Sequence, residues 1–175
     1  MRPRGLACLF LVGVAAAVIG LAGAPPARAD DTFLPIQNFG NYKCLQPENG
    51  SLELGAAIVQ EPCDSNNPAQ LWQAIPLGGD GFSFHYMNQA SQLCLDARGG
   101  ASNGTPIQQW TCNWISNEKW QPGSSFPGVA HSLTSQVSGT SSHCLDVPGA
   151  QERDHLAMQL YSCNLTVAQV WWSDD

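Results

Sequence analysis

The sequence repeats itself three times, and this repeat limits the chain to folds with three equivalent parts. A Cys-Leu pair begins at residues 44, 94 and 144, a period of 50 residues. A second cysteine follows after 18 or 19 residues, and a tryptophan stands 8 or 9 residues further on. These tryptophans close the segments Gln-Leu-Trp, Glu-Lys-Trp and Gln-Val-Trp. Chance similarity would not align so many positions, so we expect three copies of one structural unit.

Turn-forming residues divide each copy into short segments. Gly, Pro, Asn and Ser recur every 8 to 12 residues, and no stretch of useful length has helical periodicity. Short strands joined by turns predict an all-β barrel or sandwich with about four strands in each copy and about twelve in all. A copy of about 48 residues is too short to bury an apolar face alone. We therefore expect the copies, residues 31–79, 80–128 and 129–175, to close around one axis and share a core.

The repeated segments resemble those of the ricin-type lectins, the group that also includes carbohydrate-binding modules of family 13. In that family Cys-Leu-Asp, a Gln-x-(Trp/Tyr)-x-Cys segment and a closing Gln-x-Trp recur three times. The resemblance covers nearly all of the chain after the first thirty residues. It implies a β-trefoil fold, and it implies that Trp72, Trp120 and Trp171 belong to a shared core.

The first 29 residues have the pattern of a secretory signal peptide. Two arginines precede an apolar run over residues 6–24, and the small-residue segment 27–29 precedes a cleavage point before Asp30. The apolar run is rich in alanine and glycine, unlike the strongly apolar stretch of a transmembrane anchor. We therefore expect an exported, soluble, single domain of 146 residues, residues 30–175.

The charge of this domain excludes several classes of partner. Four basic residues against 14 acidic residues give a formal charge of −10. Such a surface repels phosphate groups and anionic lipid headgroups, so nucleic acids and membranes are poor candidate partners. The histidines are scattered and no cysteine pair has the spacing of a metal site. No metal and no cofactor are expected.

Loss of Cys8 with the signal peptide would leave six cysteines, an even number that favours disulfides in an exported chain. Six cysteines allow 15 pairings. The repeat favours one bridge inside each copy, namely Cys44–Cys63, Cys94–Cys112 and Cys144–Cys163. By the loop-entropy argument each bridge would stabilise the fold by roughly 3 kcal/mol.

The resemblance also implies where sugar would bind. In ricin-type lectins a competent copy uses the Asp after Cys-Leu, a Gln four residues before the second cysteine, an aromatic residue two before it, and an Asn-Gln pair that opens the closing segment. An aromatic ring can cover the C–H face of a pyranose, while a carboxylate accepts hydrogen bonds from adjacent hydroxyls. Amides both donate and accept.

The second and third copies each match four of these five positions. The second copy presents Asp96, Gln108, Trp110 and Asn117, with Glu118 in place of the Gln. The third copy presents Asp146, Gln159, Tyr161 and Gln169, with Ala168 in place of the Asn. An ionised Glu118 cannot donate a hydrogen bond, so we expect it either to repel Asp96 or to turn elsewhere, with Arg98 near enough in sequence to act as a counter-charge.

The first copy has lost most of the pattern. It presents Gln46, Val59, Glu61, Ala69 and Gln70 at the five positions. The carboxylate after Cys-Leu, the aromatic ring and the Asn are all missing. We therefore expect the first copy to be a scaffold that binds no sugar.

Together these features predict a secreted, monomeric, disulfide-linked β-trefoil that binds galactoside- or xylan-type carbohydrate through its second and third copies. An enzyme is not expected, because Asp96 and Asp146 belong to different copies and would stand too far apart to flank one glycosidic bond. The few residues after Trp171 also leave no catalytic module to expect. One alternative stays open: a protein-binding trefoil, such as a protease inhibitor or an accessory subunit, that uses an exposed loop.

Overall fold

The computed structural model describes residues 32–78, 82–125, 130–137, 139 and 142–173. The predicted signal peptide and its cleavage point lie outside these ranges. No helix within the described ranges is long and apolar enough to cross a membrane.

The described residues form fourteen short strands and no α-helix. The first copy contains β1 (Leu34–Pro35), β2 (Gln37–Asn38), β3 (Lys43–Pro47), β4 (Ile58–Pro62) and β5 (Leu71–Pro76). The second contains β6 (Phe84–Asn88), β7 (Cys94–Ala97), β8 (Ile107–Trp110) and β9 (Trp120–Ser125). The third contains β10 (Ala130–Ser135), β11 (His143–Asp146), β12 (Leu156–Ala157), β13 (Gln159–Ser162) and β14 (Val170–Trp172). A single residue interrupts the strand between β1 and β2 and again between β12 and β13, so the fourteen strands occupy the predicted twelve positions.

Five single-turn 3-10 helices accompany the strands. They are η1 (Glu48–Gly50), η2 (Pro68–Gln70), η3 (Ser116–Glu118), η4 (Pro148–Ala150) and η5 (Val167–Gln169). The helices η2, η3 and η5 come just before the closing tryptophan of each copy. Each of them therefore carries the two residues that open the predicted closing segment.

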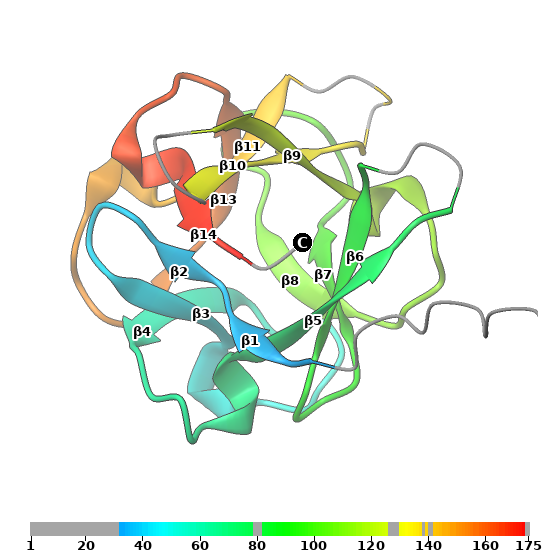
Figure 1. Ribbon diagram of the computed structural model, residues 1–175, viewed down its shortest axis with the longest axis vertical. Coiled ribbons are helices and arrows are strands. Elements are labelled where there is room, and N and C mark those ends of the chain that lie inside the picture. Colours follow the sequence, from blue (N-terminus) through cyan, green and yellow to red (C-terminus); the bar gives the residue numbers. More distant parts are fainter. Residues whose placement is uncertain (1–31, 79–81, 126–129, 138, 140–141, 174–175) are drawn as a thin grey trace, which may run out of the picture.

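The first and last strand positions of the three copies pair in a ring around the centre of the molecule (Figure 1). Strand β5 pairs with β1 and β6, strand β9 with β6 and β10, and strand β14 with β10 and β2. The second and third strand positions form the hairpins β3–β4, β7–β8 and β11–β13. A six-position barrel with three hairpins attached is a β-trefoil, so the predicted fold is confirmed.

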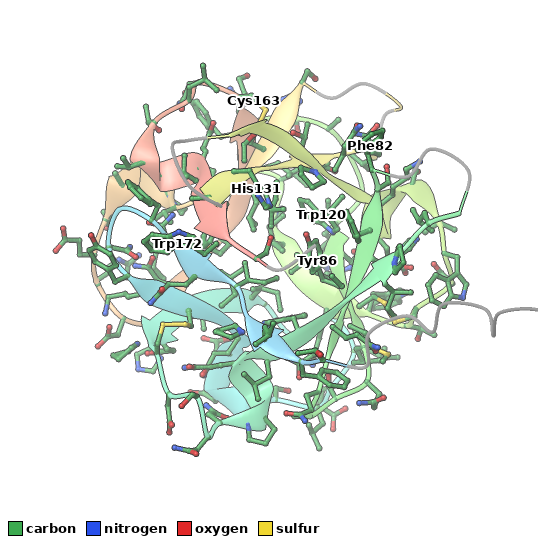
Figure 2. All side chains as sticks on the ribbon, in the orientation of Figure 1. Phe82, Tyr86, Trp120, His131, Cys163 and Trp172 are labelled. Atoms are coloured by element: carbon green, nitrogen blue, oxygen red, sulfur yellow. A yellow bond between two sulfur atoms is a disulfide. The ribbon has the colours of Figure 1, made fainter. Side chains whose placement is uncertain are left out.

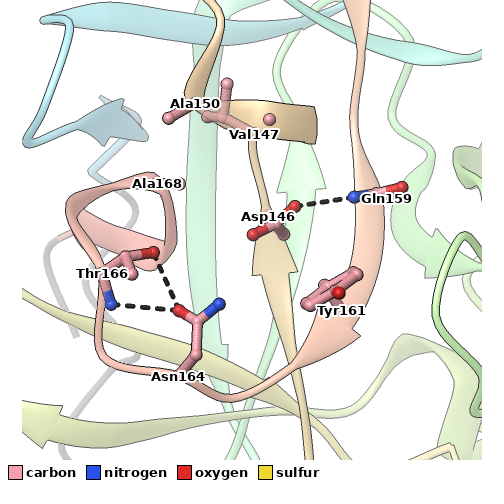
Figure 3. A pocket seen from close by; sticks show the side chains of 9 residues that line it. Asp146, Val147, Ala150, Gln159, Tyr161, Asn164, Thr166 and Ala168 are labelled. Carbon is pink, nitrogen blue, oxygen red and sulfur yellow. Dashed lines mark hydrogen bonds between the residues drawn. The ribbon is translucent and has the colours of Figure 1, made fainter.

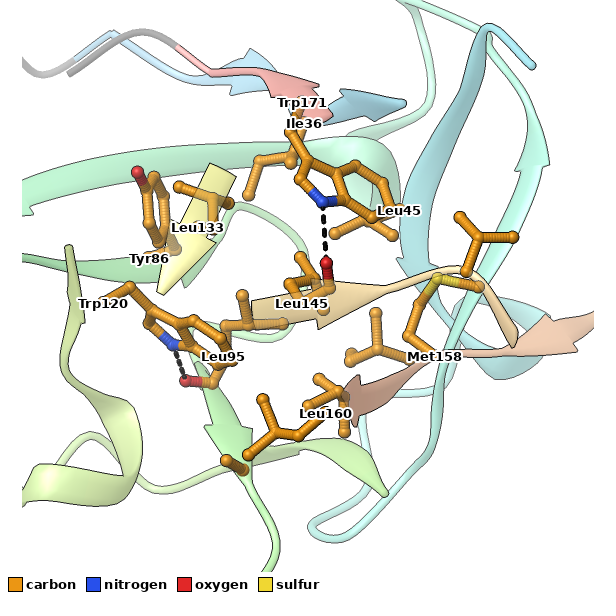
Figure 4. Packing of buried hydrophobic residues seen from close by; sticks show 14 of the residues in the cluster. Ile36, Leu45, Tyr86, Leu95, Trp120, Leu133, Leu145, Met158, Leu160 and Trp171 are labelled. Carbon is orange, nitrogen blue, oxygen red and sulfur yellow. Dashed lines mark hydrogen bonds between the residues drawn. The ribbon is translucent and has the colours of Figure 1, made fainter. Parts of the chain in front are cut away.

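The core is built from equivalent residues of the three copies (Figure 4). The leucine of each Cys-Leu pair, the closing tryptophan, and one residue from the first and third strand positions recur in it. These residues are Leu45, Leu95, Leu145, Trp72, Trp120, Trp171, Ile36, Tyr86, Leu133, Ile58, Ile107 and Met158. Figure 2 shows Tyr86 and Trp120 within the ring of strands and Phe82 at its edge. The expectation that the copies share one core is confirmed.

Each closing tryptophan is also tied to the Cys-Leu strand of its own copy. The indole Nε1 donates to the backbone oxygen of Leu45, Leu95 or Leu145 at 3.1, 2.9 and 3.1 Å. A buried carbonyl without a partner would cost stability, and the indole supplies that partner. The tryptophan is thus both a large apolar residue and the hydrogen-bond donor that positions the next residue of the strand.

The three disulfides join Cys44 to Cys63, Cys94 to Cys112 and Cys144 to Cys163. The predicted pairing within copies is confirmed. Each bridge links the start of the second strand position to the segment that follows the third. It therefore closes the hairpin on which the predicted sugar-binding residues stand.

Buried glutamines join neighbouring copies. Gln60 in β4 donates to the backbone oxygens of residues 151 and 153 in the third copy, at 2.9 and 2.8 Å. Gln109 in β8 donates to the backbone oxygens of Ser51 and Glu53 in the first copy, both at 2.8 Å. Gln109 therefore joins the second copy to the first. Its neighbour Gln108 instead stands opposite Asp96 in the hairpin.

Replacing Trp120 by phenylalanine tests the indole hydrogen bond. The variant keeps an aromatic ring but leaves the buried Leu95 carbonyl without its donor, which should lower the free energy of unfolding by about 1–3 kcal/mol. Trp110→Phe is the matched control, because that ring is exposed at the surface, and it should change stability by no more than about 0.5 kcal/mol. Urea denaturation measures both. Equal losses in the two variants would contradict the division into core and surface tryptophans.

Candidate functional site

A hollow of about 310 Å³ lies on the third copy, at the end of the β11–β13 hairpin (Figure 3). Its lining is Asp146, Val147, Gly149, Ala150, Gln159, Tyr161, Asn164, Thr166 and Ala168. Three of the four residues predicted for this copy, Asp146, Gln159 and Tyr161, are among them. The fourth, Gln169, is not.

Asp146 is held in one position by two amides. It ends β11 opposite Gln159 of β13. Gln159 Nε2 donates to its Oδ2 at 2.8 Å, and Gln169 Nε2 donates to its Oδ1 at 3.0 Å. Burial raises the pKa of Asp146, and the two amide hydrogen bonds oppose that rise. The result is an oriented acceptor at the floor of the hollow.

Gln169 is buried beneath Asp146 and does not line the hollow. Its side chain is 0% exposed. Besides the bond to Asp146, its Nε2 donates to the Ser162 oxygen at 3.1 Å and its Oε1 accepts from the Asn164 backbone nitrogen at 2.8 Å. The sequence prediction placed Gln169 among the sugar-binding positions, at a position where the family has a glutamine whose amide can steady the aspartate. The structure places it where it orients Asp146 and holds the loop after Cys163.

The aromatic ring of Tyr161 stands at the side of the hollow, 40% exposed. Facing it across the hollow is Asn164 (Figure 3), which the sequence analysis did not single out as a site residue. Asn164 Oδ1 accepts from the backbone nitrogen and the hydroxyl of Thr166 at 3.1 and 2.8 Å. Its Nδ2 has no protein partner among the described residues. The Asn-x-Thr pattern directly after the second cysteine was the available signal for this turn.

The second copy repeats the arrangement with different members. Asp96 in β7 stands opposite Gln108 in β8, and Gln108 Nε2 donates to Asp96 Oδ1 at 2.7 Å. Burial raises the pKa of Asp96, and this hydrogen bond opposes the rise. Trp110 is 39% exposed. The amide of Asn117 makes no hydrogen bond within the part of the chain that the structure describes, so it is available to a ligand.

The first copy supports the ring of Trp110 from behind. Gly55 has φ +78°, and a Cβ at this residue would lie 3.6 Å from Trp110 Cζ3. Its backbone nitrogen donates to the Gln109 oxygen at 2.9 Å. A positive φ favours glycine, which brings this turn close to the ring. The exposed ring thus stands against a fixed backbone.

Glu118 stands where the family pattern has a glutamine, and its carboxylate is fully buried, 0% exposed. Its Oε2 accepts hydrogen bonds from the backbone nitrogens of Asn113 and Trp114 at 3.1 and 2.9 Å. Burial raises the pKa of Glu118, the two N–H groups oppose this, and the charge of Asp96 raises it further. The carboxylate therefore turns to the backbone, as one sequence expectation had it. The charge of Asp96 also acts on it, as the other expectation had it.

The titratable side chain beside Glu118 is His85, not Arg98. His85 Nδ1 lies 3.8 Å from Glu118 Oε2, and Arg98 forms no ion pair with the described residues. His85 is 1% exposed in β6, and its ring and that of Trp114 are nearly perpendicular, with their centroids 4.9 Å apart. Burial lowers the pKa of His85, with the Glu118 backbone opposing and Lys119 adding to the effect. Sequence reasoning missed this contact because His85 and Glu118 are 33 residues apart.

The first copy lacks the carboxylate and the aromatic ring at the matching positions. Gln46 stands where the aspartates stand, and its Oε1 accepts from Gln70 Nε2 at 3.0 Å and Asn67 Nδ2 at 3.3 Å. Val59 is buried, and Glu61 Oε1 accepts from the His155 backbone nitrogen at 3.2 Å. The polar groups at these positions bond within the protein, and the stacking position holds no ring. Among the described residues no group of three or more His, Cys, Asp or Glu side chains could hold a metal ion.

Comparison with known proteins identifies both a family and a set of similar structures. The family model for the ricin-type beta-trefoil lectin domain matches residues 32–171. The designed three-fold symmetric protein ThreeFoil is 24% identical, with a TM-score of 0.72 over 80% of this chain and 96% of that chain. The exo-beta-1,3-galactanase 1,3Gal43A from Clostridium thermocellum is 24% identical, with a TM-score of 0.74 over 82% of this chain and 30% of that chain.

A third similar structure is the C-half of the earthworm R-type lectin in complex with GalNAc. It is 16% identical, with a TM-score of 0.59 over 79% of this chain and 95% of that chain. At such identities these likenesses show the fold alone. A comparison with curated protein sequences found no significant match.

Glu118→Gln tests the account of the second copy. Because the folded state raises the pKa of Glu118, ionising this carboxyl costs stability at neutral pH, and the cost disappears as the pH falls through the raised pKa. A glutamine amide removes that cost and can also donate to Asp96. The variant should be more stable than the parent by about 1 kcal/mol at pH 7, with a smaller gap at pH 4.

Thermal unfolding at the two pH values measures this gap. Glu48→Gln, at an exposed carboxylate on η1, is the control and should leave the transition unchanged. A Glu118→Gln variant that is less stable than the parent at pH 7, or a gap that widens on acidification, would contradict the account.

Proposed function

The chain is a member of the ricin-type beta-trefoil lectin family, and from this premise we propose that it is a secreted, non-catalytic protein that binds neutral carbohydrate through its second and third copies. The observation that carries the proposal is a combination found in both copies. A carboxylate fixed by a glutamine amide stands on the same hairpin as an aromatic ring that is about two-fifths exposed. The first copy has neither component.

The combination suits the chemistry of a sugar ring. Trp110 and Tyr161 offer flat apolar faces for the C–H side of a pyranose. Asp96 and Asp146 are acceptors for adjacent hydroxyls, and the amides of Asn117 and Asn164 supply donors. Gln108, Gln159 and Gln169 hold the carboxylates in place. The third-copy site is a hollow of about 310 Å³ lined by the β11–β13 hairpin, η4 and the segment after Cys163, a size that suits one sugar unit.

Galactosides are the first sugars to test, with xylan-type chains as the second class. The names of two similar proteins refer to galactose-type sugars: one is an exo-beta-1,3-galactanase, and the other is a lectin in complex with GalNAc. A carboxylate beside an aromatic ring suits neutral pyranoses in general. The galactose-type chain is therefore our preferred ligand class, and xylan is the comparison.

The absence of catalysis is part of the proposal. Glycosidases use two carboxyl groups that flank one bond. The lining of the third-copy hollow contains one carboxylate, Asp146, and both of its oxygens accept hydrogen bonds from amides. Asp96 stands on the β7–β8 hairpin of another copy. Export is supported by the three disulfides, because such bridges persist in oxidising surroundings.

Two weak sites on one rigid domain should act together on a polymer. A single shallow site usually binds near millimolar, about −4 kcal/mol. Simultaneous use of two sites on one chain raises the apparent affinity by about 10²-fold without any new contact. We therefore expect weak binding of free monosaccharides and firm retention on a polysaccharide.

Removing the stacking rings tests the function. Trp110→Ala and Tyr161→Ala should each reduce retention on immobilised galactan or insoluble xylan strongly, and the double variant should abolish it. All three should keep the parent's thermal transition within a few degrees, because both rings are exposed. Leu165→Ala is the control, since this leucine is exposed in the third copy but does not line the hollow.

Unchanged retention of the folded double variant would refute sugar binding at these two sites. Retention by a protein partner but by no polysaccharide would favour the protein-binding alternative. Release of the parent by free galactose or xylose would identify the ligand class.

A further inference from the structure

A second hollow adjoins the third-copy pocket, and we propose that the two hollows together hold consecutive units of a neutral saccharide chain. The second hollow measures about 250 Å³, against about 310 Å³ for the pocket at Asp146. Its lining is Asn38, Gly40, Asn41, Val147, Ala150, Glu152, Val167 and Ala168. The inference rests on the proposed function, because the first sugar unit would occupy the third-copy pocket.

The two hollows meet at a wall of short side chains. Val147, Ala150 and Ala168 line both of them. Val147 follows β11, Ala150 ends η4, and Ala168 lies in η5. A wall made of such small residues leaves room for a glycosidic bond to cross from one hollow to the other. Since the hollows are of comparable volume, a space suited to one ring has a neighbour suited to the next.

Ala168 is the residue that makes this wall low. It stands three residues before the closing tryptophan of its copy, the position that Asn117 occupies in the second copy. An asparagine here would place a polar side chain between the hollows. The departure from the repeat pattern thus removes one donor for a single sugar and opens the site to a longer ligand.

The lining of the second hollow has the two kinds of surface that a sugar needs. Val147, Val167 and Ala168 supply apolar atoms. Glu152 is exposed, and its carboxylate has no hydrogen-bond or ion-pair partner in the described ranges. Asn41 uses one N–H of its amide to bond Gln60 Oε1 at 2.8 Å, which leaves the other N–H for a hydroxyl.

Charge selects the class of saccharide. Glu152 in the second hollow and Asp146 in the first put a carboxylate in each. An anionic sugar unit would meet like charge in both, whereas a neutral hydroxyl can donate to either oxygen. The ligand is therefore a neutral chain of at least two units.

The second hollow is built before any ligand arrives, because the first and third copies are locked together beside it. Asn38 Nδ2 donates to the backbone oxygens of Val167 and Val170, both at 3.1 Å. Its Oδ1 accepts from the backbone nitrogens of Gly40 and Asn41 at 3.0 and 3.2 Å. A Cβ at Gly40 would lie 2.9 Å from Val167 Cγ2, so a larger residue here would displace the Val167 side chain. A rigid hollow binds without an added cost of ordering its walls.

The test compares one sugar unit with two at the third site alone. In a Trp110→Ala background, calorimetric titration with galactose and β-1,3-galactobiose, and with xylose and xylobiose, gives the gain from the second unit. A linked unit that finds a second subsite should tighten binding by about tenfold for the preferred sugar. In the reciprocal Tyr161→Ala background, which leaves only the second-copy site, the gain should be absent.

Two substitutions then locate the gain. Glu152→Ala should reduce the preference for the disaccharide while leaving monosaccharide binding unchanged, and Glu48→Ala is its control at another exposed carboxylate. Ala168→Asn should tighten monosaccharide binding, because it restores the amide found in the second copy, and should remove the gain from the second unit. Thermal unfolding checks that each variant is folded.

The outcomes separate the two proposals. Monosaccharide binding with no gain from the second unit would overturn the extended site and leave the proposed function standing. A full gain in both Ala168→Asn and Glu152→Ala would also overturn it. Binding of neither the monosaccharides nor the disaccharides by the folded parent would overturn the proposed function and the extended site together.

Discussion

The hydrogen bond from a closing tryptophan to the leucine carbonyl of its own copy is the contact on which the rest of the structure depends. It occurs three times, at 3.1, 2.9 and 3.1 Å. Each indole fills the shared core and, with the same side chain, fixes the strand that begins with Cys-Leu. The next residue on that strand is Gln46, Asp96 or Asp146. The direction of the candidate binding residue is therefore set by the core itself.

On this common frame, small changes in side chain decide what each copy can do. A glutamine in the closing segment bonds Gln46 in the first copy and Asp146 in the third, but in the second copy Glu118 accepts from the backbone instead. The ring position holds Glu61, Trp110 or Tyr161. Stability resides in the repeated contacts, whereas the proposed binding resides in the positions that differ. This separation allows one copy to be a scaffold while the other two carry sites.

The fold was predictable from the sequence because its causes recur at a fixed period. The Cys-Leu pairs, the closing tryptophans and the even cysteine count were enough for three copies, the disulfide pairing and the shared core, and the resemblance to ricin-type lectins implied the β-trefoil. The residues of the site were partly predictable for the same reason. What the sequence did not reveal depends on contacts across large separations: His85 beside Glu118, Gly55 behind Trp110, and Gly40 against Val167. The burial of side chains was also not visible in the sequence. Gln169 is buried beneath Asp146, and Gln109 is buried where the second copy contacts the first.

The central claim is that core and surface tryptophans do different work, and the indole N–H signals of the six tryptophans report on it directly. A ¹H–¹⁵N correlation spectrum recorded during titration with galactose or xylose follows each of them separately. The account predicts that the Trp110 signal moves with saccharide concentration, while the signals of Trp72, Trp120 and Trp171 stay in place. Movement of the three core signals with Trp110 unchanged would contradict it.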